Sequence, residues 1–406
     1  MDALLDHVAG RFGSNGEASK DASLVRLNLG AGDLPLDGYV PIDRKTGDEV
    51  FPLNYPDESV YVVRASHVLE HLPRAQTIPA LRDWARVLKP GGCCKIAVPD
   101  FDVIVRMHAA GQRGYEQYLM GGQVDDDDYH RTIWTENKLR MLMRNAGLRR
   151  VRRWVSEIKD CAALAVSLNL EGFKPEPVDV QSVQVVMSRA RYVLSSTFTC
   201  VVNACQKLGM KQQEASGPYW QQGLTNALEH AIADGAEFVL VVDGDTVFDP
   251  DDVAELYRLI AGDPTIDAIA PIQMARGMPG PLATIAGDDG KPLANIPAEW
   301  FDRDLLKCRS AHFGLTILRS ESFAKMPKPW FVGIPAPDGG WGDGRIDADV
   351  NFWLKWNDVG NSLYLAPLVC VGHVEEVVLH PSRQLTTIVQ DAGEYRREGP
   401  PVEALR

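Results

Sequence analysis

The chain of 406 residues is long enough for two domains, and its 45% of hydrophobic residues indicates a globular protein. It has no apolar run of membrane-spanning length, its acidic, interrupted N-terminus does not resemble a signal peptide, and its seven cysteines without metal-ligand spacing suit free thiols in the cytoplasm. The net charge of −13 lies mostly in the second half and argues against an extended nucleic-acid surface or binding to an anionic membrane, although a metal ion can still bring a small nucleotide to such a surface.

Near the N-terminus, two expected strands flank a glycine-rich turn. The run at residues 24–29 ends in Gly30-Ala31-Gly32, and a second strand at residues 40–42 leads to Asp43. Glycines after a strand let the backbone approach a ligand closely, and an acidic residue after the next strand can hold ribose hydroxyls. This pattern predicts a nucleotide-type cofactor held by Gly30, Gly32 and Asp43.

Five further motifs follow in order: PDESV at 56–60, ASHVLEHL at 65–72, RVLKPGG at 86–92, IAVPDF at 96–101, and a helix with a final strand at 135–151. Together with the glycine turn they resemble class I S-adenosylmethionine-dependent methyltransferases over residues 24–155, most closely the short predicted methyltransferases. The resemblance implies a Rossmann-like α/β domain that binds S-adenosylmethionine through Gly30, Gly32 and Asp43. Tyr61 stands where the family often has Asp, and no helix-opening glycine follows Gly32, so the first helix is expected to be missing or reduced.

Three histidines of this half are candidate metal ligands that need a separate interpretation. His67 and His71 are four residues apart on an expected helix and could share one face as a zinc pair does. No third ligand stands in register, so we interpret them as structural, and His130 is assigned no role. The basic run at residues 149–153 is expected to be a solvated strand edge or a domain contact.

The stretch EGFKPEPVD at residues 171–179, with two prolines and alternating charges, predicts a short, stiff linker. We therefore expect a first domain at residues 1–170, a linker at 171–180 and a second domain at 181–406. The second domain is expected to begin with a strand at 183–187 and a helix at 193–208.

A helix at 219–236 precedes the run FVLVV at 238–242, which is expected to be a buried strand of a mostly parallel sheet. The run ends in Asp243-Gly244-Asp245, and Asp249 caps a further helix that opens at Pro250. Two carboxylates at the carboxyl end of a strand project into the crevice where open α/β sheets bind ligands. Oxygen ligands of this kind suit Mg²⁺ or Mn²⁺ that bridges to substrate phosphates.

Four later motifs extend this pattern: HFGLTILR at 312–319, PWF at 329–331, DADVNF at 347–352, and YLAPLVCVGH at 364–373. The set resembles GT-A glycosyltransferases with a DxD motif over residues 238–373. The resemblance implies a second Rossmann-like α/β domain that uses Mn²⁺ or Mg²⁺ and a nucleotide-sugar donor. The hydroxyl acceptor is not identified by the sequence, and a glycan, a protein or a modified base all fit.

The resemblance also assigns roles to single residues. Asp245 and His373 are the implied metal ligands, and Asp243 would meet the donor ribose or the metal through water. The pair Ser188-Arg189 falls where the first strand of the family meets the nucleotide.

If the transfer inverts the anomeric centre, one carboxylate must deprotonate the acceptor hydroxyl. Asp349 is the implied base and Asp347 the reserve. Alternatively, both aspartates cap a helix at 350–358 and His373 is a core histidine. Retaining enzymes of this fold also have a metal-binding histidine, so the stereochemical outcome is open.

Three functions fit the sequence. One is a bifunctional enzyme that transfers a sugar and methylates the same glycan. The second is a glycosyltransferase whose methyltransferase-like half is a non-catalytic docking module. The third is a non-catalytic nucleotide-binding or assembly protein.

Overall fold

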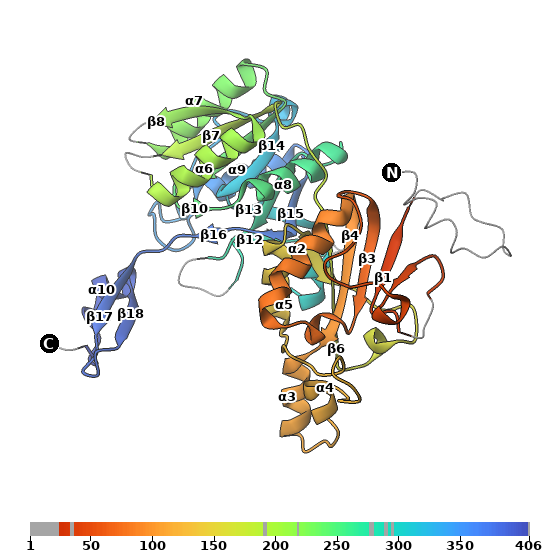
Figure 1. Ribbon diagram of the computed structural model, residues 1–406. Helices are drawn as coiled ribbons and strands as arrows, with labels where there is room; N and C mark the ends of the chain where they lie inside the picture. The colour runs from red at the N-terminus through yellow and green to blue at the C-terminus, as the bar shows by residue number, and fades with distance from the viewer. Residues whose placement is uncertain are drawn as a thin grey trace. The chain divides into compact units, whose positions relative to one another are not determined.

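A computed structural model describes residues 24–32, 36–189, 193–216, 219–275, 280–287, 291–293 and 296–404. The chain forms two compact units, residues 1–176 and 177–406 (Figure 1). Within the described residues, none of the helices is both long enough and apolar enough to span a membrane.

The division between the units falls inside the expected linker, but the linker begins later than predicted. Strand β6, Ser167–Phe173, includes the first three residues assigned to the linker. Glu171 is buried in this strand, and its Oε1 accepts a hydrogen bond of 2.9 Å from Arg152 Nε. The alternating charges that suggested a linker therefore belong partly to a sheet.

The first unit is built on a six-stranded mixed sheet. The strand order is β2-β1-β3-β4-β6-β5, in which β2, β1, β3 and β4 are parallel, while β6 is antiparallel to both β4 and β5. Besides β6, its strands are β1 (Arg26–Leu29), β2 (Val40–Ile42), β3 (Val60–Ser66), β4 (Leu88–Pro99) and β5 (Arg149–Arg153). The basic run at 149–153 is thus an edge strand, as expected.

Helices α2 (Thr77–Val87) and α5 (Glu136–Asn145) pack on the apolar face of this sheet and on each other. Leu81, Trp84 and Leu139 of these helices are fully buried with alternate strand residues such as Leu27 and Ile96. Two shorter helices, α3 (Phe101–Ala109) and α4 (Glu116–Met120), follow β4.

The other face of the sheet carries a row of polar side chains. Strand register places Asn28, Arg64, Lys95, Glu171 and Arg152 next to one another across five strands. Arg64 Nη1 donates to Asn28 Oδ1 at 3.2 Å, and Lys95 Nζ lies 3.7 Å from Glu171 Oε2. Because each charge has a neighbour of opposite sign or a hydrogen-bond acceptor, the row can be buried without leaving a charge uncompensated.

The expected helix that carries both His67 and His71 is wrong. Strand β3 continues to Ser66, and His67 adopts a left-handed conformation with φ of 56°. A 3-10 turn, η2 (Leu69–His71), follows, and it does not include His67. In the region of the expected reduced first helix, residues 33–35 lie outside the described part of the chain, and a 3-10 turn, η1 (Arg44–Thr46), follows β2.

The second unit contains an eight-stranded mixed sheet of order β12-β13-β15-β11-β14-β9-β7-β8. Strand β9 is parallel to β7 but antiparallel to β14, so the sheet is less parallel than predicted. Its strands are β7 (Val183–Arg189), β8 (Lys211–Ser216), β9 (Phe238–Asp243), β11 (Ala268–Ile272), β12 (Ala283–Ile285), β13 (Leu306–Ala311), β14 (Leu315–Arg319) and β15 (Leu363–Cys370).

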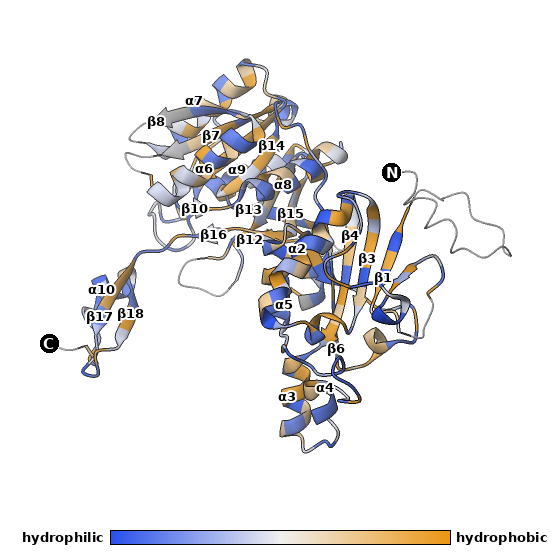
Figure 2. Ribbon diagram, viewed as in Figure 1, coloured by the Kyte–Doolittle hydropathy of each residue, from blue (hydrophilic) through white to orange (hydrophobic). Residues whose placement is uncertain are grey.

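Helices cover both faces of this sheet, which explains the unbroken apolar run of β9 (Figure 2). Val239 and Val241 face the cluster that contains residues of α7 (Trp220–Ala233) and α9 (Ala348–Asp358). Phe238, Leu240 and Val242 face the cluster that contains residues of α6 (Ser195–Leu208) and α8 (Pro250–Gly262). All five side chains are at most 1% exposed.

Two short strand pairs complete this unit. Strands β10 (Thr246–Val247) and β16 (Gly372–His373) pair antiparallel. Beyond them, β17 (Val377–Pro381) and β18 (Thr387–Asp391) form a hairpin that continues into α10 (Ala392–Glu398).

An aromatic cluster beneath α9 supports the second unit. Phe352 is fully buried, stacks on Phe331 at a centroid distance of 4.7 Å, and meets Phe313 edge-on at 5.3 Å.

We predict that Phe352→Ala lowers the free energy of unfolding by about 3–5 kcal/mol, because it removes a ring and leaves a cavity. Denaturant unfolding followed by tryptophan fluorescence measures the change. Phe198→Ala on α6, where the ring is 39% exposed, is the matched control and should cost far less; equal losses for the two variants would contradict the assignment.

Candidate functional site

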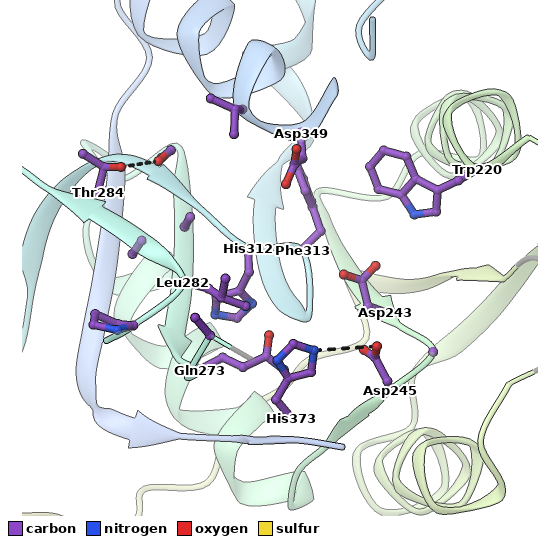
Figure 3. A pocket seen from close by; sticks show the side chains of 17 residues that line it. Trp220, Asp243, Asp245, Gln273, Leu282, Thr284, His312, Phe313, Asp349 and His373 are labelled. Carbon is purple, nitrogen blue, oxygen red and sulfur yellow. Dashed lines mark hydrogen bonds and ion pairs between the residues drawn. The ribbon is translucent and has the colours of Figure 1, made fainter. Parts of the chain in front are cut away.

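Three of the four predicted acidic site residues of the second unit line one cleft of about 740 Å³ at the carboxyl end of β9. Asp243, Asp245, Asp349 and His373 all contribute to its wall, and Figure 3 shows them pointing into the same opening. Asp243 and Asp245 lie more than a hundred residues before Asp349 and His373 in the sequence. The fold therefore brings together four of the residues that the sequence analysis selected.

The β10–β16 pair holds Asp245 next to His373. Thr246 is the register partner of His373, and the Asp245 carbonyl accepts a hydrogen bond of 2.8 Å from Val374 N. His373 Nδ1 lies 3.0 Å from the Met274 carbonyl, which can only accept, so Nδ1 carries the proton. In the neutral ring the lone pair of Nε2 then faces Asp245 Oδ2 at 3.7 Å.

That geometry fits a shared cation. Two ligand atoms on one ion with bonds of about 2.1 Å stand roughly 3–4 Å apart, which is the separation of Nε2 and Oδ2. The donor set of carboxylates and one imidazole is chemically suited to Mn²⁺ or a similar divalent ion. The residues present therefore fit the metal that the sequence implied.

The two candidate catalytic aspartates differ in their positions. Asp347 occupies the N-cap position of α9, but its exposed side chain makes no capping bond and accepts from Arg345 Nε at 2.9 Å. Asp349 lies in the first turn of α9 and lines the cleft. The helix is anchored where Asn351 Nδ2 donates to the Val332 carbonyl at 2.7 Å. Only Asp349 of the two is placed to meet a molecule in the cleft.

Ser188 and Arg189 are the last two residues of β7, and Ser188 pairs in register with Asp243. The backbone at Ser188 therefore ends beside the first aspartate of the motif. The side chains of both residues lie outside the described part of the structure.

The sequence analysis missed a buried polar group at the floor of the cleft. Gln273 Nε2 donates to Thr246 Oγ1 at 3.0 Å, and both side chains are nearly inaccessible to solvent. Gly314 lies against them, because a Cβ atom there would be 2.5 Å from Gln273 Oε1 and 2.7 Å from Thr246 Oγ1. Gly314 in the motif HFGLTILR could have indicated a close contact at this position. The contact is with Gln273, however, which is 41 positions away in the chain, so the motif alone does not reveal it.

His312 completes this floor and is neutral at ordinary pH. Its Nε2 donates to the Pro271 carbonyl at 2.9 Å, and its Nδ1 accepts from Gly314 N at 3.0 Å. Burial lowers the pKa of His312 to about 4, and the hydrogen bond to Pro271 offsets this only in part. His312 thus fixes the backbone of the cleft instead of supplying charge to it.

The first unit has a second cavity, of about 360 Å³, on the polar side of its sheet. Gly30 and Gly32 line it, together with Arg64, Ser66 and Asp160. Gly30 has φ of 61°, and a Cβ atom there would lie 2.5 Å from Val68 Cγ2. The glycine turn therefore brings bare backbone to the cavity.

Asp43 stands behind this turn and does not line the cavity. Its Oδ2 accepts from Gly32 N at 2.9 Å and its Oδ1 from Lys45 N at 2.9 Å. In this structure the carboxylate fixes the glycine turn and the η1 turn, so its role is at least partly structural.

The sequence analysis did not select Arg64 and Asp160, which form a buried ion pair in the cavity wall, with side chains 6% and 11% exposed. Burial alone would raise the pKa of Asp160, but hydrogen bonds from Arg64 and Ser66 outweigh burial and lower the pKa. The pair therefore stays charged at neutral pH. Little in the sequence pointed to this pair, since Arg64 lies inside an otherwise apolar strand.

Comparison with known proteins supports part of this description. Residues 42–96 match the family model described as a methyltransferase domain. No curated protein matches the chain.

Three solved structures are similar to parts of the chain. A197 from STIV is 13% identical, with a TM-score of 0.34 over 52% of this chain and 94% of that chain. GalNAc-T7 with UDP, GalNAc and Mn²⁺ is 14% identical, with a TM-score of 0.35 over 50% of this chain and 45% of that chain. A possible histamine N-methyltransferase from Thermotoga maritima is 16% identical, with a TM-score of 0.26 over 42% of this chain and 87% of that chain. Because these identities and TM-scores are low, the solved structures do not support a functional conclusion, and the function is argued from the residues of this chain.

The buried His312 generates a prediction about pH. Its pKa is 6.5 in the unfolded chain and about 4 in the folded one, so between these values the unfolded chain binds more protons. Stability is therefore fully present above pH 6.5 and falls as the pH drops toward 4, by about 3 kcal/mol from this residue.

Unfolding free energies between neutral pH and pH 4 measure this slope, which His312→Gln should reduce. His230→Gln, at an exposed position on α7, is the control and should leave the slope unchanged. A slope that is identical in wild type and His312→Gln would show that the buried imidazole is not responsible.

Proposed function

We propose that the second unit is a metal-dependent glycosyltransferase that moves a sugar from a nucleotide-sugar donor to a hydroxyl acceptor. The observation that carries the proposal is the convergence of Asp243, Asp245, Asp349 and His373 on one cleft at the carboxyl end of β9. Three carboxylates line this cleft, and a divalent cation bound beside them would offset their repulsion of an anionic diphosphate. The cleft is large enough for a ligand of nucleotide size.

In this proposal Asp245 and His373 hold the metal, and Asp243 meets the donor ribose or the metal through water. When bound, the cation supplies the positive charge that stabilises the diphosphate leaving group. The hydrogen bond from His373 Nδ1 to Met274 keeps the imidazole turned toward Asp245. Ser188 and Arg189, at the end of the neighbouring strand, are proposed to contact the nucleotide.

Asp349 is the proposed general base of an inverting transfer. It enters the cleft from α9, on a different element from the metal ligands, and can therefore contact the acceptor instead of the diphosphate. A general base must lie within hydrogen-bond reach of the hydroxyl that it deprotonates. Asp347 is less suited, because Arg345 holds its carboxylate at an exposed position.

For the first unit we propose S-adenosylmethionine-dependent methyl transfer. The match of residues 42–96 to a methyltransferase domain supports it, as does the cavity lined by Gly30 and Gly32. The bare backbone at the glycine turn suits the methionine part of the cofactor, and a held acceptor beside the methyl group would suffice for transfer.

A second candidate for the first unit is a non-catalytic docking module. The observation in its favour is that Asp43, the expected ribose ligand, is turned to Gly32 and Lys45 and does not line the cavity. In this alternative only the second unit carries out chemistry.

We predict that Asp245→Ala reduces metal-dependent turnover of nucleotide sugars at least about 100-fold, because it removes a metal ligand. Asp349→Asn should lower kcat about 10²–10⁴-fold and retain metal binding, since it removes only the base. The measurement is Mn²⁺-dependent hydrolysis or transfer across a panel of nucleotide sugars, with circular dichroism to verify the fold. Asp343→Asn, in an exposed loop, is the control. Unchanged turnover in Asp245→Ala would rule out this metal site.

We also predict that the full chain binds S-adenosylmethionine and that Asp43→Ala weakens binding at least about tenfold, because the glycine turn loses the carboxylate that fixes it. Titration calorimetry measures the affinity, and Asp37→Ala at an exposed position serves as the control. If the wild-type chain gives neither heat nor a thermal shift with millimolar cofactor, the docking alternative is correct.

A further inference from the structure

A second group of metal-ligand side chains lies in the first unit, away from the glycine turn. Glu70, His71 and His130 each offer one ligand atom, and these atoms all lie within 4.8 Å of one another. Glu70 and His71 belong to the η2 turn. His130 is brought to them because Arg131 N donates to the Glu70 carbonyl at 2.7 Å and Thr132 N donates to it at 3.2 Å.

Glu70 is a buried carboxylate without a hydrogen bond. Its side chain is fully buried, and neither Oε1 nor Oε2 has a hydrogen-bond partner. Leaving a buried charge in this state is costly, so such a group calls for a partner of positive charge.

The nearest candidate for that partner is His67, whose Nδ1 lies 3.0 Å from Glu70 Oε1 without hydrogen-bond alignment. His67 Nε2 contacts Ser167 Oγ at 3.0 Å, and Ser167 in turn donates its proton to Asn169 Oδ1. His67 is therefore held by Ser167, and in this orientation it makes no hydrogen bond with the Glu70 carboxylate.

The other two imidazoles are turned to receive a cation. His130 Nδ1 lies 3.0 Å from the Tyr118 carbonyl, which only accepts, so Nε2 of the neutral ring is left with its lone pair. His71 Nδ1 is buried and has no hydrogen-bond partner. The two rings meet nearly perpendicular, at 83°, with centroids 4.8 Å apart. Fixing one ring nitrogen by a backbone carbonyl is the usual way in which proteins orient a metal-binding histidine.

We propose that Glu70, His71 and His130 bind a divalent transition-metal ion of the Zn²⁺ class. Two imidazoles and one carboxylate are a ligand set for zinc and related ions, whereas Mg²⁺ and Ca²⁺ favour oxygen ligands. Ligand atoms of a tetrahedral ion with bonds of about 2.1 Å stand roughly 3.4 Å apart, so the three side chains, whose ligand atoms lie within 4.8 Å, would move together by about 1 Å to close the site. Three protein ligands leave a fourth coordination position open. Ser66, one residue before His67, lines the cavity of the same unit.

The test uses the full chain with Asp245→Asn and His373→Gln in every sample, so that the cleft of the second unit does not contribute metal binding. Each protein is stripped with a chelator and titrated with Zn²⁺ by calorimetry, and Co²⁺ spectra report the coordination. Glu70→Gln and His130→Gln are the test variants. His108→Gln, at an exposed position on α3, is the matched control, and circular dichroism verifies that each variant folds.

We expect the parent to bind one Zn²⁺, with affinity at least about tenfold weaker in Glu70→Gln and in His130→Gln and unchanged in His108→Gln. The Co²⁺ complex should show the strong visible absorption of a four-coordinate site in the parent and in His108→Gln, and this absorption should be lost in Glu70→Gln and in His130→Gln. If Glu70→Gln does not fold, the partly exposed His130→Gln decides the question. Absence of stoichiometric Zn²⁺ binding in the parent, or binding in both test variants as tight as in the parent, would overturn the proposal.

Discussion

The candidate cleft of the second unit depends on a strand pair only two residues long on each side. Thr246 pairs with His373 and Val247 with Gly372, which fixes Asp245 and His373 next to each other although 127 residues separate them. A Cβ atom at Gly372 would lie 2.5 Å from Val247 Cγ2, so the pairing requires glycine before the histidine. Thr246 is fully buried and accepts a hydrogen bond from Gln273. The hydrogen bond between Gln273 and Thr246, which is buried from solvent, thus stabilises this short strand pair.

The charge of the cleft follows from the same arrangement. Asp243 and Asp245 follow a buried strand, Asp349 opens a helix, and no protein cation is among the residues that line the described part of the cleft. His312 is kept neutral by its burial and by two backbone hydrogen bonds. A divalent cation bound among these carboxylates would reduce the repulsion between them, which is why such a wall suits a metal ion. The cleft is therefore negatively charged, as is the second half of the sequence as a whole.

How much the sequence could predict depended on whether a feature was local. The strand at 238–242 and its two aspartates were readable because an apolar run and its polar end are adjacent in the chain. His373 and Asp349 were found only through resemblance, since nothing in their own neighbourhood shows that they meet Asp245. Gln273 and the Arg64–Asp160 pair were missed, because their meaning comes from partners 27 and 96 positions away. The expected helix at His67 failed because the strand before it continues to Ser66, which apolar spacing alone did not reveal.

The polar face of the sheet in the first unit contains a buried ion pair, Arg64–Asp160, in the wall of the cavity. An ion pair such as Arg64–Asp160 loses much of its Coulomb energy to desolvation, so stability alone is a weak reason for its presence. It lies in the wall of the cavity, and hydrogen bonds from Ser66 and Ser156 satisfy the Asp160 carboxylate further. An amino-acid carboxylate entering this cavity would have to compete with Asp160 for Arg64 or pair with Lys159, which also lines the cavity and is exposed. Pairing with Lys159 is the less costly arrangement, because it leaves the buried ion pair intact. The charge pattern of the cavity therefore allows an amino-acid-bearing cofactor without rearrangement of the sheet.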